Sequence, residues 1–540
     1  MAWVLRYEIA INFFCNYNFY MGLYVNPGNE NFTAAIRSEI YVDKTMLLSE
    51  LNRRLGTEDR FLAVSRPRRF GKTMAENMIA AYYSKGCDSR ELFETLEISG
   101  EQSFSKHLNK YNMLYLDINA FWSENKNAAF SAMKKEVLRE FKFEFPDTDF
   151  SDVYTVENAI RRVYEQTRIP FVLVLDEYDT IFRTAECSSI ENDYLSFLNS
   201  MFKGAAMTSC ITLAYITGIL PIIREKAQSK LNNFDEITFL APGRFAKFTG
   251  FTGDEVKELC CEYHMDYEEC RSWYDGYSVR GEELYAPRSV AKAMSEGEYK
   301  SYWSQTSTFR VVKDIIALNF SNMKTDVEKL VSGFSVPVNI MKFENTPSRI
   351  FSRDDAFTYL CHLGYLSYDS QSGTCRIPNR EVRMEWVNAI EDDPDYSVLY
   401  RMIQDSKEAL QAAWDGNGPR LAEVLGRAHE RLTSPLSYNN EQSFQSAIRL
   451  AFFYADSYYT VISEYPSGKG YADIAFIPYK PNIPAMVVEL KVRGTADTAL
   501  DQIRAKRYFA GLEKYAGNIL LVGVSYDRET KKHECVMERA

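Results

Sequence analysis

The sequence lacks several features that would assign it quickly to a class of protein. No apolar run reaches about 18 residues, so we expect no membrane-spanning helix. The 10 cysteines are scattered without the spacing of a disulfide framework, which favours reduced thiols in a cytoplasmic protein. The first 20 residues have no clean cleavage site of a signal peptide, so we treat residues 1–20 as an uncertain leader.

An excess of positive charge is also lacking. The net charge of −11 argues against a surface with general affinity for nucleic acid. The charge is uneven, however, because residues 436–540 contain 13 Lys and Arg against 12 Asp and Glu. This distribution is compatible with a nucleic-acid site in the C-terminal part, since only nearby charges matter for phosphate contacts.

The remaining composition is that of an ordinary globular protein. Hydrophobic residues make up 46% and charged residues 25%, and 540 residues are too many for one core, so we expect about three domains. Four side chains resemble a set of zinc ligands: Cys260, Cys261, His264 and Cys270. Their spacing matches no zinc motif and the segment has the pattern of an amphipathic helix, which we favour over a zinc site.

One stretch, Phe61–Ala81, has the pattern of a buried strand, a basic turn and a helix. Gly71, Lys72 and Thr73 stand at the predicted start of the helix. Such a turn can surround phosphates with backbone N–H groups, while the lysine reaches the terminal phosphates and the hydroxyl binds Mg²⁺. Arg66 occupies the place of the first glycine in the usual GxxxxGK[ST] pattern, so this stretch alone is weak evidence.

A second apolar run, Pro170–Leu175, ends in Asp176 and Glu177. A strand buried on both faces of a parallel sheet delivers its polar residues at its carboxyl end. Asp176 would hold Mg²⁺ beside the loop hydroxyl, and Glu177 would orient or deprotonate the attacking water. The alternative is a strand that merely ends in an acidic turn. The alternating strand–helix pattern favours a nucleotide site, with Thr217 at the end of a third strand near the γ-phosphate.

Another group of polar residues lies in the C-terminal part. Asp473 stands near the start of the predicted strand 471–477, and Glu489 and Lys491 share one face of the strand 485–492. Two carboxylates and a lysine on one sheet face predict a metal site for phosphodiester hydrolysis, in which the lysine polarises the attacking water. An exposed Glu–Lys pair on a half-buried strand is the alternative.

Polar residues around these strands support the metal site. A predicted helix follows with Gln502, which can orient a substrate, and with basic groups that can approach a phosphate backbone: Arg504, Lys506 and Arg507. Glu441, in the helix before the strands, is a further candidate metal ligand. Earlier in the chain, residues 354–379 predict a helix and a hairpin resembling a winged helix, which we expect to pack between domains, with DNA contact as the alternative.

With both sites in view, the chain resembles bacterial AAA-ATPase-like proteins that carry a C-terminal PD-(D/E)XK nuclease-like domain. The motifs that carry the resemblance are Tyr41–Thr45, Ser65–Thr73, Leu175–Asp179, Thr217-Gly218, Trp273–Tyr277, Pro378–Val382, and Asp473 with Glu489 and Lys491. The resemblance implies that the arginines of the loop are its normal form. It therefore adds Arg68, Arg69 and Phe70 to the expected nucleotide contacts.

The chain departs from this family pattern at two places. Thr217 is followed by Gly-Ile-Leu-Pro instead of the usual Gly-Val-Ser-Arg, which leaves Arg224 as a candidate sensing arginine. Tyr471 stands where an arginine often follows the glycine before the nuclease aspartate.

We therefore expect an α/β protein in three parts. These are a P-loop NTPase domain with a parallel sheet and flanking helices over residues 21–290, a helical region with the winged-helix-like element over 291–430, and a restriction-endonuclease-like α/β domain over 431–540. The expected cofactors are ATP and Mg²⁺, and the expected partner is DNA or RNA, with conflict with mobile elements or phages as the biological setting. The alternative function is a nucleotide-controlled binding or scaffold protein whose nuclease fold does not cut. The oligomeric state stays open.

Overall fold

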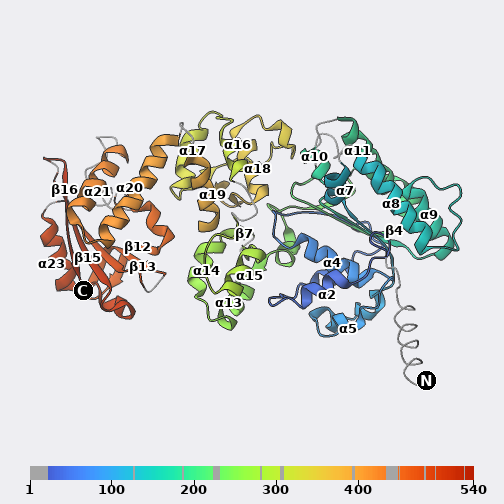
Figure 1. Cartoon of the computed structure of the whole chain (residues 1–540), viewed down its shortest axis with the longest axis horizontal. Coiled ribbons are helices and arrows are strands. Elements are labelled where there is room, and N and C mark those ends of the chain that lie inside the picture. Colours follow the sequence, from blue (N-terminus) through green and yellow to red (C-terminus); the bar gives the residue numbers. More distant parts are fainter. Residues whose placement is uncertain are drawn as a thin grey trace, which may run out of the picture. The chain divides into compact units, whose positions relative to one another are not determined.

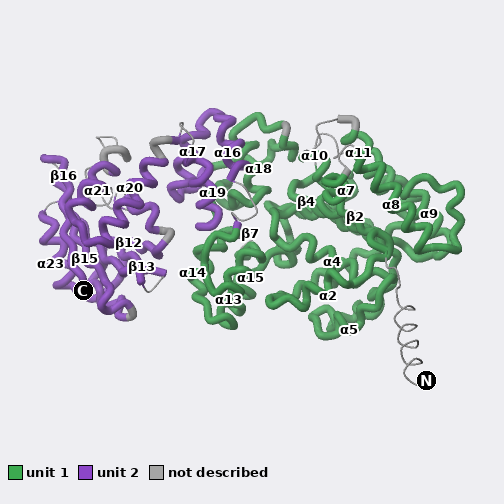
Figure 2. Tube along the Cα trace, viewed as in Figure 1, with its two compact units in different colours: residues 1–302, 337–378 green, residues 303–336, 379–540 purple. Residues whose placement is uncertain are grey.

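The computed structural model describes residues 22–540 apart from short gaps. The gaps are residues 126–127, 185–187, 223–230, 280–281, 304–308, 392–395, 433–447, 449–450, 480–481, 493 and 528. The chain forms two compact units (Figure 2). Unit 1 comprises the residues up to Tyr302 together with Pro337–Pro378, and unit 2 comprises Trp303–Val336 and Asn379–Ala540. No helix of the described residues has the length and apolar composition needed to cross a membrane.

A five-stranded parallel sheet lies at the centre of unit 1, as expected for the fold class. Its strands, in the order β2-β3-β4-β1-β5, are β2 (Asn112–Asp117), β3 (Phe171–Asp176), β4 (Ile211–Gly218), β1 (Phe61–Ser65) and β5 (Asp235–Ile237). Every residue of β1, β3 and β4 is buried, because helices cover both faces of the sheet. The carboxyl ends of β1, β4 and β3 therefore lie next to one another at one edge.

Two apolar layers pack against this sheet (Figure 1). One layer is built by α8 (Ala129–Glu144), α9 (Val156–Thr167) and α11 (Ser188–Lys203). The other is built by α2 (Glu30–Ile36), α3 (Met46–Asn52) and α4 (Lys72–Tyr83). Shorter helices complete this part: α5 (Arg90–Phe93), η1 (Glu97–Gly100), α6 (Phe104–His107), α7 (Ile118–Asn125), α10 (Thr180–Thr184), α12 (Ala205–Thr208) and η3 (Gly243–Phe248).

A smaller helical part completes unit 1. It contains β6 (Phe251–Thr252), α13 (Gly253–Glu262), α14 (Tyr267–Tyr274), β7 (Tyr277–Val279), β8 (Glu282–Tyr285) and α15 (Pro287–Glu296). The motif Trp273–Tyr277 anchors this part, since the Tyr277 hydroxyl donates to the Gly364 carbonyl at 2.6 Å. Gly276 has a φ of 111°, and a Cβ there would lie 2.0 Å from the Pro378 carbonyl oxygen, so only glycine fits.

The expected helix and hairpin after residue 350 are present in unit 1. They are η4 (Pro347–Arg349), α18 (Arg353–Leu363), β10 (Ser367–Asp369) and β11 (Thr374–Arg376), and β9 (Val336–Pro337) precedes them. α18 ends three residues before the expected Leu366, because Gly364 takes a left-handed φ of 84° and closes the helix.

Unit 2 has a mixed five-stranded sheet in the order β12-β13-β14-β15-β16. The strands are β12 (Tyr459–Ser467), β13 (Gly470–Pro478), β14 (Ala485–Lys491), β15 (Ile519–Asp527) and β16 (Lys532–Arg539), and only β14 and β15 pair in parallel. α23 (Ala496–Lys506) and η7 (Ala510–Tyr515) cover one face. The other face packs against α20 (Ser397–Trp414), α21 (Gly418–Leu432) and η6 (Phe453–Ser457), and α16 (Arg310–Ile316), α17 (Met323–Val331) and α19 (Arg380–Glu391) complete the unit.

The sequence also predicts a helix after Tyr41–Thr45 that ends at Leu55, with Asp43 or Thr45 as its N-cap. This helix is present but shorter: α3 spans Met46–Asn52, and its N-cap is Thr45. The Asp43 carboxylate accepts the backbone N–H groups of Thr45 and Glu97, at 2.8 Å each. These bonds fix Asp43 outside the helix.

Candidate functional site

Arg66, the residue that replaces the first glycine of the loop, has a structural role. Its side chain is completely buried, and its Nε donates to the Thr249 hydroxyl at 2.7 Å. Its Nη1 donates to the Ile237 carbonyl at 3.0 Å, at the end of β5. Burial lowers the pKa of Arg66 to about 10. The guanidinium therefore connects the start of the loop to Thr249 and to the end of β5.

The rest of the loop has the backbone of an anion-binding turn. Arg69 and Gly71 have left-handed φ angles of 71° and 84°, with Phe70 between them. Such an alternation of backbone conformations gathers successive N–H groups around a concavity, and α4 begins directly behind it. The Phe70 ring is fully buried against Phe239 and Tyr277, which fixes the loop in place.

Lys72 lies within the loop, as the sequence predicts. Its Nζ donates to the carbonyl oxygens of Arg66 and Pro67, at 3.2 Å each. Burial lowers the pKa of Lys72, and the nearby carboxylates of Glu177 and Asp176 oppose this shift. The ammonium group is thus a buried cation with only neutral hydrogen-bond acceptors, which suits a phosphate.

Three predicted residues meet at the carboxyl edge of the parallel sheet. Thr73 donates its hydroxyl to Asp176 Oδ2 at 2.9 Å, and Thr217 donates its hydroxyl to Asp176 Oδ1 at 2.9 Å. The strand order explains this convergence, because β4 lies between β1 and β3 and so places Thr217 between the loop and Asp176. A hydroxyl and a carboxylate in direct contact are oxygen ligands of the kind that Mg²⁺ prefers.

Glu177 is held by a residue that the sequence reasoning missed. Arg183, on α10, forms ion pairs with Glu177 Oε2 at 3.0 Å and with Asp179 Oδ2 at 2.9 Å. Glu177 has a left-handed φ of 49°, an uncommon conformation for a residue with a side chain. The Asp179 carboxylate also accepts the backbone N–H groups of Ile219 and Leu220, which ties the end of β3 to the end of β4.

Glu76 is a second residue that the sequence reasoning missed. It lies one helical turn after Lys72, is completely buried, and forms no hydrogen bond of normal geometry with the described residues. Burial, together with the charge of Asp176, raises its pKa well above the usual range of a carboxyl group. Its spacing of four residues from Lys72 is the only signal in the sequence, and a glutamate there is usually exposed.

A pocket of about 490 Å³ opens at this loop. The cations Arg68, Lys72 and Arg288 line it, and none of these forms an ion pair with another described residue. Apolar side chains line it as well: Phe32, Ile40, Val42, Met78, Phe248 and Phe251. Arg69 also lines the pocket, but its Nη1 donates to the Tyr302 carbonyl at 3.2 Å. The pocket therefore combines an anion site with an apolar site.

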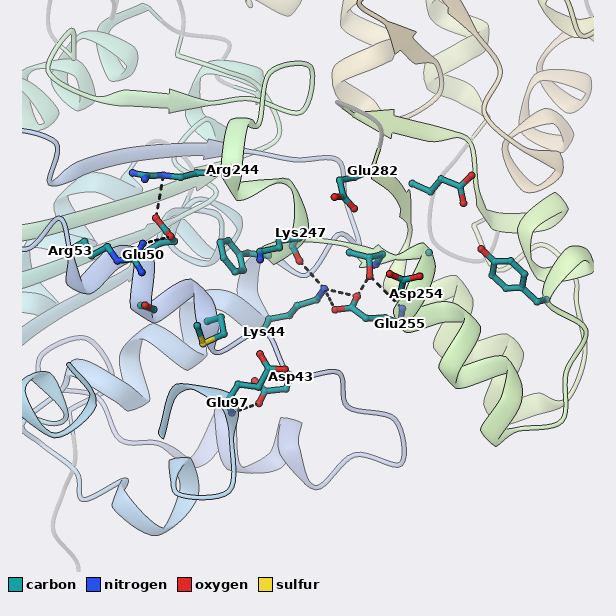
Figure 3. Close-up of a pocket in the computed structure, with 17 residues that line it drawn as sticks. Asp43, Lys44, Glu50, Arg53, Glu97, Arg244, Lys247, Asp254, Glu255 and Glu282 are labelled. Atoms are coloured by element: carbon teal, nitrogen blue, oxygen red, sulfur yellow. Dashed lines mark hydrogen bonds and ion pairs between the residues drawn. The ribbon is translucent and has the colours of Figure 1, made fainter. Parts of the chain in front are cut away.

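A neighbouring pocket of about 670 Å³ has a different character (Figure 3). Charges of both signs line it and form pairs with one another. Lys44 bonds to both carboxylate oxygens of Glu255, at 2.5 and 2.6 Å, and Arg244 pairs with Glu50 at 3.2 Å. Lys44 belongs to the motif Tyr41–Thr45, which thus joins the large domain of unit 1 to the start of α13. Because Lys44 and Arg244 are already paired with carboxylates, this pocket is the weaker candidate for an anionic ligand.

The C-terminal residues Asp473, Glu489 and Lys491 also come together. Asp473 Oδ2 accepts the backbone N–H of Leu490 at 2.7 Å, at the point where β13 stops pairing with β14. Lys491 Nζ lies 3.2 Å from Glu489 Oε1, and Gln502 on α23 donates to the same oxygen. The alternation of β14 places Glu489 and Lys491 on the face that α23 covers.

Glu489 is a buried carboxylate whose hydrogen bonds and charge are only partly satisfied by the described residues. Its side chain is 2% exposed, and its Oε2 has no hydrogen-bond partner among the described residues. Burial and then the charge of Asp473 raise the pKa of Glu489 to about 7, although Lys491 opposes the shift. A divalent cation fits this donor set, because it would meet the bare oxygen and neutralise the two carboxylates.

Glu441 and Arg224 lie outside the described residues. Within the described residues, no group of three or more His, Cys, Asp or Glu side chains is arranged to hold a metal ion. Cys260 and Cys270 are buried in one apolar cluster while Cys261 is exposed, so the cysteines of α13 and α14 do not converge as zinc ligands.

Two known protein families match regions of this chain. Residues 27–227 match the AAA-ATPase-like family, described as predicted AAA-ATPase. Residues 439–535 match the PD-(D/E)XK nuclease superfamily. The chain thus contains an AAA-ATPase-like domain followed by a domain of the PD-(D/E)XK nuclease superfamily, which confirms the resemblance drawn from the sequence motifs.

A curated relative is similar over part of the chain. It is described as an uncharacterized protein in the vnfD 5′ region of Azotobacter chroococcum mcd 1, and it is 24% identical over 294 residues. The match covers 51% of this chain and 52% of the relative, so it spans about half of each.

Proposed function

We propose that this protein is a Mg²⁺-dependent ATPase whose nucleotide cycle controls a metal-dependent nuclease acting on DNA or RNA. In this proposal residues 21–290 form the ATPase, 291–430 connect the two activities, and 431–540 carry the nuclease. The eight described cysteines are free thiols, which supports a reducing, cytoplasmic setting.

The pocket at the loop supports ATP as the nucleotide. Its volume of about 490 Å³ lies in the range of small-molecule sites, and its lining of cations and apolar side chains suits a triphosphate and a base. We assign the backbone of Arg69, Phe70 and Gly71 to the phosphates, and Arg68 and Lys72 to their charge. Thr73 and Asp176 would hold Mg²⁺, which neutralises the phosphates when bound.

Two further residues take part in our proposal for ATP hydrolysis. Glu177 would accept a proton from the attacking water, since a carboxylate beside the phosphate loop can act as a general base. Thr217 would report the γ-phosphate to Asp176, because its hydroxyl already bonds to that carboxylate. A change of ligand at Asp176 would therefore alter its hydrogen bond with Thr217 at the end of β4.

The nuclease assignment rests on one observation above the others: Glu489 is a buried carboxylate with a bare oxygen beside Asp473 and Lys491. An exposed Glu–Lys pair on a surface strand would have neither this burial nor this raised pKa. We assign Asp473 and Glu489 to a divalent cation, Glu441 to a third ligand position, and Lys491 to the attacking water. Gln502 would orient Glu489.

The test uses the purified full chain with Mg²⁺ or Mn²⁺ and with single-stranded and double-stranded DNA and RNA. We expect cleavage by the wild type and its loss in Asp473→Ala, while ATP hydrolysis persists in that variant. Asp497→Ala is the matched control, because Asp497 is an exposed acid on α23. If no substrate is cut with either metal but nucleic acid binds in an ATP-dependent way, the protein is instead a non-cutting binding or scaffold protein.

A further inference from the structure

The phosphate loop is hydrogen-bonded to the residue at which the chain first leaves unit 1. The chain passes between the two units at three places, after Tyr302, Val336 and Pro378. Arg69 of the loop lines the pocket described above, and its Nη1 donates to the Tyr302 carbonyl at 3.2 Å. A residue of the candidate nucleotide pocket therefore bonds directly to the last residue before the first crossing.

A carboxylate of unit 2 holds the other side of the same peptide group. The N–H of Trp303 belongs to the peptide bond between Tyr302 and Trp303, and it donates to Glu381 Oε1 at 2.8 Å. Glu381 is buried in the first turn of α19. Arg69 and Glu381 thus bond to the two ends of one peptide dipole. Since a guanidinium on the carbonyl polarises the peptide group and makes its N–H a better donor, the two bonds strengthen each other.

The side chain of Tyr302 fixes where this residue lies. Its ring packs in the apolar cluster of α13, α14 and α15, and its hydroxyl donates to the Glu298 carbonyl at 2.9 Å. The peptide group that follows can still rotate, because rotation needs only changes of the backbone torsions on either side of it. The bond from Arg69 therefore helps to set the direction of the carbonyl and, through the same planar group, that of the Trp303 N–H.

A second crossing is also connected to the loop. The Phe70 ring packs edge-on against Tyr277, with 5.4 Å between the ring centroids. The residue before this tyrosine, Gly276, lies so close to Pro378 that a Cβ would be 2.0 Å from the proline carbonyl oxygen. Pro378 is the last residue of unit 1 before α19. Two of the three crossings are therefore connected to adjacent residues of the loop, Arg69 and Phe70.

We propose that Arg69 transmits the nucleotide state of unit 1 to unit 2. Without nucleotide its guanidinium bonds to the Tyr302 carbonyl, and with ATP it turns to a phosphate in the pocket that its side chain already lines. Phosphate competes well with a neutral carbonyl, because a guanidinium can form two charge-assisted hydrogen bonds with it. Loss of the guanidinium then weakens the bond between the Trp303 N–H and Glu381. This inference rests on the proposed function and supplies the first step of its control by ATP.

The test follows hydrogen exchange of the Trp303 amide in the full chain by mass spectrometry, with and without a non-hydrolysable ATP analogue and Mg²⁺. In the wild type we expect the analogue to speed this exchange about tenfold, because the amide loses a bond that protects it. In Arg69→Asn the exchange should be fast without nucleotide, since asparagine tolerates the left-handed φ of 71° but is too short to replace the guanidinium. Arg168→Asn is the matched control, because Arg168 is an exposed arginine with a φ of 56°.

A second measurement tests the same coupling from unit 2. Glu381→Gln keeps an acceptor oxygen for the Trp303 N–H, but an amide is a weaker acceptor than a carboxylate. The Tyr302 carbonyl then holds Arg69 less strongly, so we expect calorimetry to show an affinity for the analogue about fivefold higher than in the wild type, because coupling acts in both directions. A merely structural role of Glu381 predicts no gain in affinity. Glu391→Gln, at the exposed end of α19, is the matched control and should keep the wild-type affinity.

The proposal is overturned if the analogue binds to the wild type but leaves the exchange of the Trp303 amide unchanged or slows it. It is also overturned if Arg69→Asn without nucleotide exchanges as slowly as the wild type, or if Glu381→Gln binds the analogue no more tightly. The proposed ATPase survives each of these results, because calorimetry measures nucleotide binding separately. If the analogue does not bind to the wild type, the proposed function and this inference fail together.

Discussion

Asp176 and Glu489, the carboxylates proposed to bind metal in the two sites, differ in how completely the chain satisfies their oxygens. Asp176 receives the hydroxyls of Thr73 and Thr217, one on each oxygen. Glu177 likewise has the guanidinium of Arg183. In the C-terminal site, by contrast, Glu489 keeps one buried oxygen without a hydrogen-bond partner among the described residues. At Asp176 and Glu177 the first site is therefore satisfied without a ligand, and the second site is not.

This difference predicts the order in which ligands bind. A buried polar atom without a partner costs about 1–3 kcal/mol, so a cation that meets Glu489 Oε2 recovers that cost. At Asp176 a cation must instead displace a hydroxyl that is already bonded. We therefore expect the C-terminal site to bind Mn²⁺ or Mg²⁺ by itself, and the site at Asp176 to bind the metal together with ATP.

Among the proposed substitutions, Glu177→Gln should have the largest effect, and it should act on ATP hydrolysis at the first of the two sites. Glutamine keeps the size of the side chain but cannot accept the proton, so we expect ATP hydrolysis to fall about 10³-fold. ATP binding should stay near the wild-type value, because Arg68 and Lys72 are unchanged. Phosphate release and a thermal shift with ATP and Mg²⁺ separate the two quantities. Hydrolysis within a few-fold of the wild type would remove Glu177 from the role of general base.

Lys72→Ala should have the next largest effect. The buried ammonium donates only to two loop carbonyls, and its loss leaves the phosphates without their central charge. We expect the affinity for ATP to fall about 100-fold, since hydrogen bonds to charged groups are worth about 1.5–3 kcal/mol each. Calorimetry measures the affinity, and Lys142→Ala, an exposed lysine on α8, is the control. A normal affinity in Lys72→Ala would place the nucleotide elsewhere.

The C-terminal site should respond to pH. The pKa of Glu489 is raised to about 7, so below that value the carboxyl group carries a proton that a cation must displace. We expect the affinity for Mn²⁺ in the absence of ATP to fall about tenfold for each pH unit below 7 and to level off above it. Titration calorimetry at several pH values measures this slope. Glu489→Gln should bind weakly at every pH.

The raised pKa of Glu489 also predicts the direction in which the stability of the protein changes with pH. The folded protein binds the proton of Glu489 up to a higher pH than the unfolded chain does. Without metal, the contribution of Glu489 to stability should therefore decrease as the pH rises from about 4.5 to about 7 and stay constant above. Added Mn²⁺ should raise the melting temperature of unit 2 more at pH 8 than at pH 6. An equal shift at both values would contradict the raised pKa.

Much of both sites could be predicted from the sequence, because strand ends and strand alternation are local properties. Asp176 and Thr217 follow apolar runs, and parallel strands end at one edge, so their meeting required only the correct fold class. Glu489 and Lys491 are two residues apart on one strand and must share a face. The basic loop could likewise be predicted from the sequence, although no local pattern indicates the burial of Arg66.

The contacts that sequence reasoning missed join distant segments of the chain. Arg66 bonds to Thr249 and Ile237, more than 170 residues away in each case. Gly218 illustrates the same limit, because a Cβ there would lie 2.7 Å from both Asp179 and the Tyr178 ring. Such close packing leaves no pattern in the local sequence. The role of Arg183 was missed for a different reason, since an arginine in a short helix is usually a surface residue.

A substitution of Arg183 should have the smallest effect of those proposed, and it tests how Glu177 is held at the first of the two sites. Its guanidinium bridges Glu177 and the fully buried Asp179, with ion-pair distances of 3.0 and 2.9 Å. Lysine keeps the charge but is a point donor that cannot bridge two carboxylates in the same way. Because Asp179 is buried, we expect it to retain the cation in Arg183→Lys and Glu177 to lose its support.

The expected result for Arg183→Lys is a fall of kcat for ATP hydrolysis of about 3- to 10-fold, with the affinity for ATP unchanged, because Glu177 would be less well positioned. Steady-state kinetics and calorimetry give the two numbers. Arg162→Lys is the control, since Arg162 pairs with Asp152 on the exposed surface. An increase of kcat would mean that Arg183 restrains Glu177 rather than positions it, and the ion pair at the first site would then be a brake on hydrolysis.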